Sequence, residues 1–455
     1  MQRSLVVVTV LLFLACGGKN PPPLVDGILL VTIDTCRSDR IGCYGNAEAS
    51  TPFLDRTAAE GVLFTNCIAE IPTTLSSHTT ILSSLYPRTH RVPRNGFRVP
   101  EDVRTIAQIF RERGFRTGAF VSAFSLHRTF GLDRGFSVYD DITDETPDGG
   151  QLERRASTVT RYASEWLGAA GEEPFFLWVH YFDPHWPYDP PPPYGSIRRV
   201  PEGAYRTTSL EDLKRIRSGL APLRPSDRDA FFAAYDGEIA FVDRWLERLL
   251  EAVPKGRREG LLLVIAGDHG EGFGEHMYFF DHGEYLWASA VDVPLILHGP
   301  SIVREPRIEE APVRLLDLAP TLLEAAGLPI PSIFEGESLL PAARGPIAPR
   351  VVFSEASKPW SIEPETEYQN KYKAKAVRDE RWKYIVTPFR DRKELYDLWE
   401  DPSETRNVIG LDPKRAAEME RSLLEWIRER DPGFQTGDLT VEAEIREKLR
   451  ALGYY

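Results

Sequence analysis

The sequence lacks the features that mark several classes of protein. Its 455 residues include only four cysteines, too few for a disulfide scaffold. It has no excess of basic residues: 55 Lys and Arg stand against 68 Asp and Glu, a net charge of −13, so no nucleic-acid partner is expected. With 42% apolar and 27% charged residues, wholesale disorder is excluded as well. The composition predicts a soluble, globular, enzymatic body, which would bind an anion only through a metal or a local cluster of donors.

The first 26 residues are predicted to lie outside that body. Arg3 precedes an apolar run over residues 5–14, which is shorter than the roughly 20 residues that span a bilayer, so residues 1–15 have the pattern of a secretory signal peptide. The stretch LFLACG resembles a bacterial lipobox, in which the cysteine, here Cys16, becomes the lipidated N-terminus. Residues 16–26 would then form a tether. Plain cleavage, an uncleaved anchor and an apolar N-terminal strand are the alternatives.

This N-terminus predicts an exported bacterial lipoprotein of the cell envelope, on its periplasmic or surface side, held to the membrane by the lipid anchor. Export implies an oxidising compartment, in which two of Cys36, Cys43 and Cys67 could form a disulfide. The sequence does not determine which two.

Beyond the tether, short β-rich runs alternate with longer stretches of helical periodicity, which predicts an α/β domain with a mostly parallel sheet over residues 27–345. The continuous apolar runs at 27–33, 175–179 and 261–265 are typical of strands covered on both faces.

From about residue 351 the pattern changes. Residues 382–387 and 394–398 favour antiparallel strands. One amphipathic helix is expected from the spacing of Ala416, Met419, Leu423, Leu424 and Ile427. We therefore predict a separate C-terminal subdomain over residues 346–455.

Each of the three apolar runs leads into a polar cluster. The first is followed by Asp34, the second by His180, Asp183 and His185, and the third by Asp268 and His269. Ligands of open α/β sheets bind outside the carboxyl ends of the strands, so these side chains are expected at one rim. Carboxylates and imidazole are ligands that hold a divalent cation, which makes Asp34, Asp268 and His269 a predicted metal site. The alternative is that Asp268 caps a helix beginning at Gly270.

A hydroxyl-rich segment, residues 72–80, precedes the apolar positions Ile81, Leu82 and Leu85. This pattern predicts a loop that enters a helix with a Thr or Ser at its cap. A hydroxyl there is commonly only a cap. The same position also suits catalysis, because the positive end of a helix favours an anionic ester and a nearby metal ion turns a hydroxyl into a nucleophile.

These segments together resemble the sulfatase family, within the alkaline phosphatase superfamily. The motifs that carry the resemblance are DTCRSDRIGCYG (34–45), TPFLD (51–55), DPH (183–185), GDHGE (267–271) with GEH (274–276), DLAPTL (317–322) and ELYDL (394–398). The resemblance spans nearly the whole chain after the tether. It implies a large mixed sheet between helices and a small C-terminal antiparallel sheet with one helix.

The chain departs from the family at the nucleophile. Sulfatases carry a Cys or Ser that is oxidised to formylglycine, and alignment places Thr74 there, with Ser76 and His78 where Pro and Arg are usual. Thr74 cannot become formylglycine, because its β-carbon carries a methyl group. The arrangement resembles the threonine nucleophile of related phosphodiesterases and phospho-group transferases. That resemblance implies that Asp34, Thr74, Asp268 and His269 hold one divalent metal ion.

Two further positions differ from the usual sulfatase pattern. Thr35 stands where many sulfatases have a second Asp, which lowers the charge around a calcium ion and, with an imidazole ligand, favours zinc or manganese. The ion is therefore expected to be calcium, zinc or manganese. Ser122-Ala123-Phe124 replaces the Lys-Trp-His stretch that supplies a sulfate-binding lysine.

The prediction for function is a metal-dependent hydrolase that cleaves phosphate mono- or diesters through a covalent intermediate on Thr74. His185 would contact substrate or protonate the leaving group, His282 would contact substrate, and His78 would orient Thr74. Asp183, His185 and His282 could instead hold a second metal. The expected partner is a small anionic ester of glycan or lipid origin. Sulfate-ester hydrolysis, phospho-group transfer to an envelope acceptor and a non-catalytic surface binding module are the alternatives.

Overall fold

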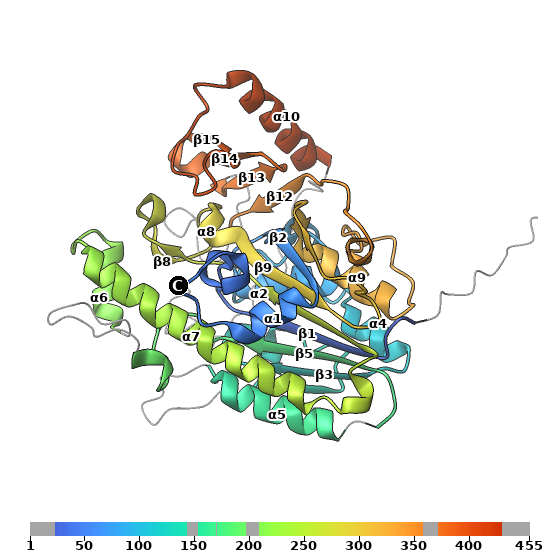
Figure 1. Ribbon diagram of the computed structural model, residues 1–455. Coiled ribbons are helices and arrows are strands. Elements are labelled where there is room, and N and C mark those ends of the chain that lie inside the picture. Colours follow the sequence, from blue (N-terminus) through green and yellow to red (C-terminus); the bar gives the residue numbers. More distant parts are fainter. Residues whose placement is uncertain (1–22, 143–152, 170, 197–208, 358–371, 430–455) are drawn as a thin grey trace, which may run out of the picture.

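The computed structural model describes residues 23–142, 153–169, 171–196, 209–357 and 372–429 (Figure 1). Its centre is a nine-stranded sheet with the order β10-β2-β9-β6-β1-β5-β3-β4, and β11 pairs with β2. The strands are β1 (Gly27–Ile33), β2 (Val62–Ile68), β3 (Arg116–Val121), β4 (Val138–Asp140), β5 (Phe175–Tyr181), β6 (Leu261–Gly267), β9 (Asp292–His298), β10 (Arg307–Glu309) and β11 (Val313–Arg314). Only β9 runs antiparallel to its neighbours, so the predicted mostly parallel mixed sheet is confirmed.

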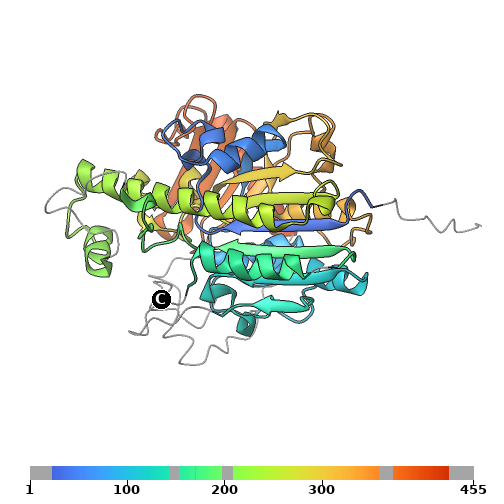
Figure 2. The same cartoon turned by 60° about the horizontal axis from the view of Figure 1, so that its bottom comes forward.

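Helices cover both faces of this sheet, which is why its central strands read as continuous apolar runs (Figures 1 and 2). Alternate residues of β1 point into the cores on opposite faces of the sheet. Ile28 and Leu30 pack into the first core, and Leu29, Val31 and Ile33 pack into the second. The first core is closed by α2 (Thr74–Ser83), α4 (Ile106–Glu112) and α9 (Leu318–Ala325), and the second by α1 (Pro52–Ala59), α5 (Ala156–Gly168) and α7 (Pro225–Ala252). The other helices of this part of the chain are α3 (Pro87–His90), α6 (Leu210–Arg217) and α8 (Ala288–Val291).

Two smaller sheets complete the described chain. A hairpin is formed by β7 (Gly272–Phe273) and β8 (Phe279–Asp281). The C-terminal sheet is antiparallel, in the order β12 (Val352–Glu355), β13 (Lys375–Arg378), β14 (Trp382–Thr387) and β15 (Arg392–Asp397), and α10 (Pro413–Glu429) packs on it. The predicted small sheet with one helix is thus confirmed. Within α10, Trp426 is buried whereas the expected core residue Leu424 is 43% exposed.

The predicted signal peptide, Cys16 and most of the tether lie outside the described residues. Within the described ranges, no helix combines the length and the apolar character needed to cross a bilayer. Cys36, Cys43 and Cys67 are free thiols, so the disulfide that two of them could form is not present in this structure. Cys36 and Cys67 are buried in the cores on opposite faces of the central sheet, which keeps these two apart.

Candidate active site

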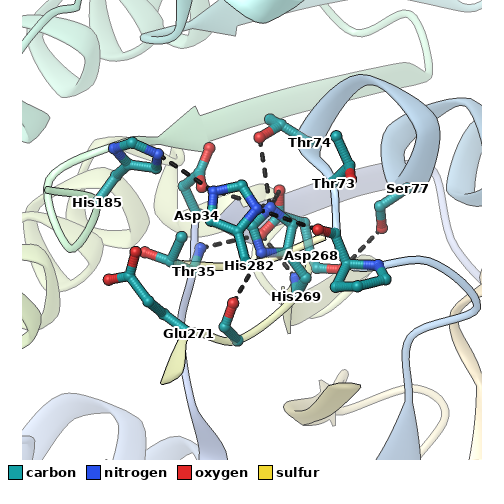
Figure 3. Close-up of polar contacts among 12 residues, drawn as sticks. Asp34, Thr35, Thr73, Thr74, Ser77, His185, Asp268, His269, Glu271 and His282 are labelled. Carbon is teal, nitrogen blue, oxygen red and sulfur yellow. Dashed lines mark hydrogen bonds and ion pairs between the residues drawn. The ribbon is translucent and has the colours of Figure 1, made fainter. Parts of the chain in front are cut away.

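Three neighbouring strands deliver the polar clusters to one rim of the sheet, as the sequence predicted (Figure 3). β1 lies between β5 and β6, and the last residue of β1, Ile33, pairs with Tyr181 and Gly267. The next residue, Asp34, continues the ladder by donating its N–H to the Tyr181 carbonyl over 2.8 Å. Asp268 does the same toward the Ile33 carbonyl over 3.3 Å. Parallel register therefore places Asp34 and Asp268 side by side.

Asp34, Asp268 and His269 form a closed cluster in which one potential ligand atom of each lies within 4.8 Å of the others, and all three are fully buried. The His269 Nδ1–H donates to the Gly270 carbonyl over 2.9 Å, because a carbonyl can only accept. In the neutral ring, Nε2 then carries a lone pair. It lies 3.8 Å from Asp34 Oδ1 and 3.6 Å from Asp268 Oδ2.

The electrostatics of this cluster fit a bound cation. Among the described residues, no hydrogen bond of good geometry reaches either oxygen of Asp34 or Oδ2 of Asp268. Burial raises the pKa of both carboxyl groups, and for Asp268 the charge of Asp34 adds to the increase. Two buried carboxylates and an imidazole lone pair that converge without a cationic side chain are costly unless a metal ion lies between them. This donor set of two oxygens and one nitrogen suits a divalent ion.

Asp268 has a second task in the turn beside it. Its Oδ1 accepts the backbone N–H of His269 at 2.7 Å and that of Thr35 at 3.1 Å. The alternative of a helix cap does not hold, because no helix begins at Gly270. Thr35 itself has a φ of 49°, a left-handed conformation that is strained for a β-branched residue. This strained turn directs the Thr35 N–H at Asp268 and leaves the Asp34 side chain in the cluster.

Thr74 is the first residue of α2, and its hydroxyl lies 3.4 Å from His269 Nε2 (Figure 3). The helix is fixed against the cluster, because the Ser77 hydroxyl donates to the Asp268 carbonyl over 2.7 Å. Asn95 accepts the Leu75 N–H over 2.8 Å and so satisfies one of the free amides of the first turn. The structure therefore brings together Asp34, Thr74, Asp268 and His269, and it places Thr74 at the positive end of a helix dipole.

His78 lies one turn further along α2 and contacts the backbone of Thr74, not its hydroxyl. Its Nδ1–H donates to the Thr74 carbonyl over 2.7 Å, so its Nε2 accepts the Thr32 hydroxyl over 2.9 Å. Thr32 in turn accepts from Trp178 Nε1 over 3.0 Å and contacts His180 Nδ1 at 3.1 Å. Burial lowers the pKa of His78. A neutral ring at the base of the helix orients Thr74 through its main chain.

His185 and His282 face each other beside the cluster, with their Nε2 atoms 3.4 Å apart. His185 Nδ1 donates to the Trp186 carbonyl at 2.6 Å, and His282 Nδ1 to the Pro72 carbonyl at 3.1 Å. Both Nδ1 atoms therefore carry protons. Two bare Nε2 lone pairs this close would repel, so the pair is suited to hold a shared proton or a cation.

Asp183 does not join these histidines. Its two oxygens accept the Ala156 N–H at 3.1 and 2.9 Å at the start of α5. This bond fixes the carboxylate at the helix start, which weakens the alternative of a second metal ion on Asp183, His185 and His282. Among the described residues, Asp34, Asp268 and His269 form one group with metal-binding geometry, and Asp183 is outside it.

The sequence places His180 in the polar cluster after the second apolar run without giving it a catalytic or metal-binding role, and it gives no role to Thr32. His180 Nε2 lies 3.3 Å from Asp34 Oδ2, which places this ring against a predicted metal ligand. The available signal was strand periodicity, since His180 shares a face of β5 with Trp178 and pairs in register with Thr32 of β1. Ser122, at the position of the missing lysine stretch, is buried, and its hydroxyl binds the His180 carbonyl.

Comparisons with known proteins agree with these motifs. The family model described as "Sulfatase" matches residues 27–328, and the model described as "N-sulphoglucosamine sulphohydrolase, C-terminal" matches residues 274–431. A Delta 4,5-hexuronate-2-O-sulfatase of Bacteroides thetaiotaomicron is 24% identical over 96% of both chains.

Two solved structures share the fold. One, determined in complex with its substrate D-glucosamine-2-N,6-O-disulfate, has a TM-score of 0.74 at 20% identity and covers 91% of this chain and 99% of its own. The other is the phosphonate monoester hydrolase of Agrobacterium radiobacter, with a TM-score of 0.72 at 22% identity, covering 89% of this chain and 96% of its own.

Proposed function

The chain belongs to the sulfatase family of hydrolases, and from its site we propose that it cleaves phosphate mono- or diesters through a covalent bond to Thr74. The observation that carries the proposal is the position of the Thr74 hydroxyl. It occupies the start of α2, 3.4 Å from His269 Nε2, beside a buried acidic cluster. A threonine supports direct nucleophilic attack, whereas it cannot supply the formylglycine of sulfate-cleaving relatives.

The reaction proceeds in two displacements. The Thr74 hydroxyl gives up its proton as its oxygen forms a bond to phosphorus and the bond from phosphorus to the leaving alcohol breaks, and the alcohol leaves with a proton. We assign the source of that proton to the His185–His282 pair, whose Nε2 atoms lie 3.4 Å apart and can share one. A water molecule then attacks phosphorus, and Thr74 leaves as its hydroxyl, reclaiming a proton.

Asp34, Asp268 and His269, joined by the Thr74 oxygen, are the residues that would hold one divalent ion of calcium, zinc or manganese. When bound, the ion supplies positive charge that lowers the pKa of the Thr74 hydroxyl and offsets the charge of the phosphoryl oxygens. His78 and Thr32 hold the start of α2 in place for this attack. The substrate is proposed to be a small anionic ester of glycan or lipid origin, met at the cell envelope.

Sulfate-ester hydrolysis is the second candidate. It is favoured by the names of similar proteins, a Delta 4,5-hexuronate-2-O-sulfatase and a protein bound to D-glucosamine-2-N,6-O-disulfate. The two candidates differ at one residue, since phosphate cleavage by this route needs the Thr74 oxygen.

The test compares nitrophenyl phosphate, its diester, a phosphonate monoester and nitrophenyl sulfate as substrates of the signal-less protein. Thr74→Val should abolish turnover. The acid-stable phosphorylated peptide that contains residue 74, expected from the wild type, should not be detected in this variant. The matched control is Thr79→Val, since Thr79 is buried in the same helix and its hydroxyl binds only the Leu75 carbonyl in the described contacts. Sulfate turnover that survives Thr74→Val would overturn the mechanism. Transfer of the phospho-group to an added alcohol in place of water would favour a transferase, and a metal-free protein without turnover would favour a binding module.

A further inference from the structure

The C-terminal sheet reaches into the catalytic body beside the segment that carries Thr74. Ser354 of β12 donates its hydroxyl to the Ala69 carbonyl over 2.9 Å, and the Glu355 N–H donates to the Glu70 carbonyl over 2.8 Å. Just beyond β12, the Ser357 N–H donates to the Gly283 carbonyl over 2.8 Å. The subdomain thus contacts both the entry to α2 and the loop of His282.

Ser357 joins these two segments through its side chain. Its hydroxyl donates to the Gly283 carbonyl over 3.1 Å, because a carbonyl can only accept. The Thr73 hydroxyl must then be the donor in the short hydrogen bond that it makes with Ser357 Oγ. Both hydroxyls are buried, Thr73 at 2% and Ser357 at 0% exposure. The Lys373 ammonium donates to the Ser357 carbonyl over 2.6 Å and so fixes the serine from the subdomain side.

The role of Thr73 is unusual for its position. It is the N-cap residue of α2, where a threonine side chain normally accepts an N–H of the first helical turn. Here no such bond forms, and the hydroxyl points to Ser357 instead. In place of an N-cap hydrogen bond, the Thr73 hydroxyl links the segment that precedes Thr74 to Ser357, a residue 284 positions away in sequence.

We propose that Ser357 is a positioning residue, through which the C-terminal subdomain sets the place of Thr74 relative to His282. His282 is tied to the same segment from its own side, through Nδ1 and the Pro72 carbonyl at 3.1 Å. Thr73, Ser357, Gly283, His282 and Pro72 therefore form a closed ring of bonds and contacts beside Thr74. The catalytic consequence rests on the proposed function, because it requires Thr74 to be the nucleophile.

The experiment removes the link from either end. Ser357→Ala and Thr73→Val each delete the same hydrogen bond, so one of them serves if the other fails to fold. The matched control is Ser354→Ala, which removes a buried hydroxyl of the same strand region that binds the catalytic body but touches neither Thr73 nor Gly283.

Both link variants should lower kcat at least about 10-fold with KM changed less than about 3-fold, since small displacements of reacting groups are costly. The loss of kcat in the double variant Thr73→Val/Ser357→Ala should be no larger than the loss in the more damaged single variant. When Thr73→Val is combined with Ser354→Ala, the two fold-losses of kcat should multiply. Amide hydrogen exchange provides a measurement that is independent of turnover. Residues 71–78 and 280–286 should exchange faster in Ser357→Ala and in Thr73→Val. In Ser354→Ala, residues 280–286 should exchange at the wild-type rate.

Unchanged exchange at residues 280–286 in Ser357→Ala would overturn the proposal, whatever the activity. Equal loss of kcat in Ser354→Ala would overturn it as well, because the effect would then be general destabilisation. A wild-type protein that cleaves no ester would defeat the proposed function alone, and the exchange result would still decide the role of Ser357.

Discussion

Replacing Asp268 by Asn tests the metal site through the sign of its effect on stability. Asn keeps the oxygen that accepts from Thr35 and His269 but removes the negative charge. The ligand atoms of Asp34 and Asp268 lie within 4.8 Å, at which two like charges repel by about 3.5 kcal/mol at an effective dielectric constant of 20. The metal-free variant should therefore be more stable than the metal-free wild type, by up to about 3.5 kcal/mol near pH 8.

Metal should offset the variant's advantage, and at 1,000 times the dissociation constant it should reverse the order. A bound ion present at 100 times its dissociation constant adds about 2.7 kcal/mol to the free energy of unfolding, and about 4.1 kcal/mol at 1,000 times. The wild type should show this gain, whereas the variant should lose most of it along with bound metal.

The assay is urea unfolding with excess chelator, and then with zinc, manganese or calcium added singly, together with measured metal content. Asp243→Asn is the matched control, because Asp243 is also a buried carboxylate that accepts two backbone N–H groups, from Phe53 and Leu54. It should leave the gain from metal unchanged. An Asp268→Asn protein that binds metal with wild-type stoichiometry and gains as much stability would refute the assignment of the cluster.

The remaining predictions concern stability, the base of α2 and the N-terminus. Burial raises the pKa of Glu70 from 4.5 to about 8, so the folded state holds this proton more tightly than the unfolded state. The difference contributes at most about 5 kcal/mol to the free energy of unfolding. This contribution is present below pH 4.5 and is lost as the pH rises toward 8. Glu70→Gln should remove this loss, seen as a flatter dependence of the urea midpoint between pH 5 and 8; a slope equal to wild type would contradict the shift. Thr32→Val should lower the free energy of unfolding by about 1–3 kcal/mol, because His78 and Trp178 lose the hydroxyl to which both are hydrogen-bonded. The substitution should also affect kcat more than KM. Unchanged kinetics would count against the role of His78. Cys16→Ser should release the protein from membranes in fractionated cells and abolish labelling by a fatty-acid probe; labelling that persists would exclude the proposed anchor.

The covered strands and the rim were predictable because they depend on local pattern. The apolar run at residues 261–265 is typical of a strand buried on both faces, and the end of that strand places Asp268 and His269. Parallel pairing with β1 then leaves little freedom in where Asp34 lies. The family motifs added the identity of Thr74, which periodicity does not distinguish from its neighbouring hydroxyls.

Side-chain direction was not predictable, because it depends on contacts between residues far apart in the chain. Asp183 follows β5 as expected, yet it turns to accept the Ala156 N–H and leaves His185 and His282 to face each other. For His180 the sequence left packing and support of the site residues open, and only the fold places its Nε2 3.3 Å from Asp34. In each case the acceptor or neighbour belongs to another element of the fold.

The amino-acid sequence alone determined which elements form and which chemical groups reach the rim, since strand burial and helix periodicity are encoded within a few neighbouring residues. Only the tertiary structure decided the protonated nitrogen of each histidine and the partner of Thr73. Those choices follow from which carbonyl or hydroxyl lies within about 3 Å once the chain has packed, and packing is a property of the whole fold.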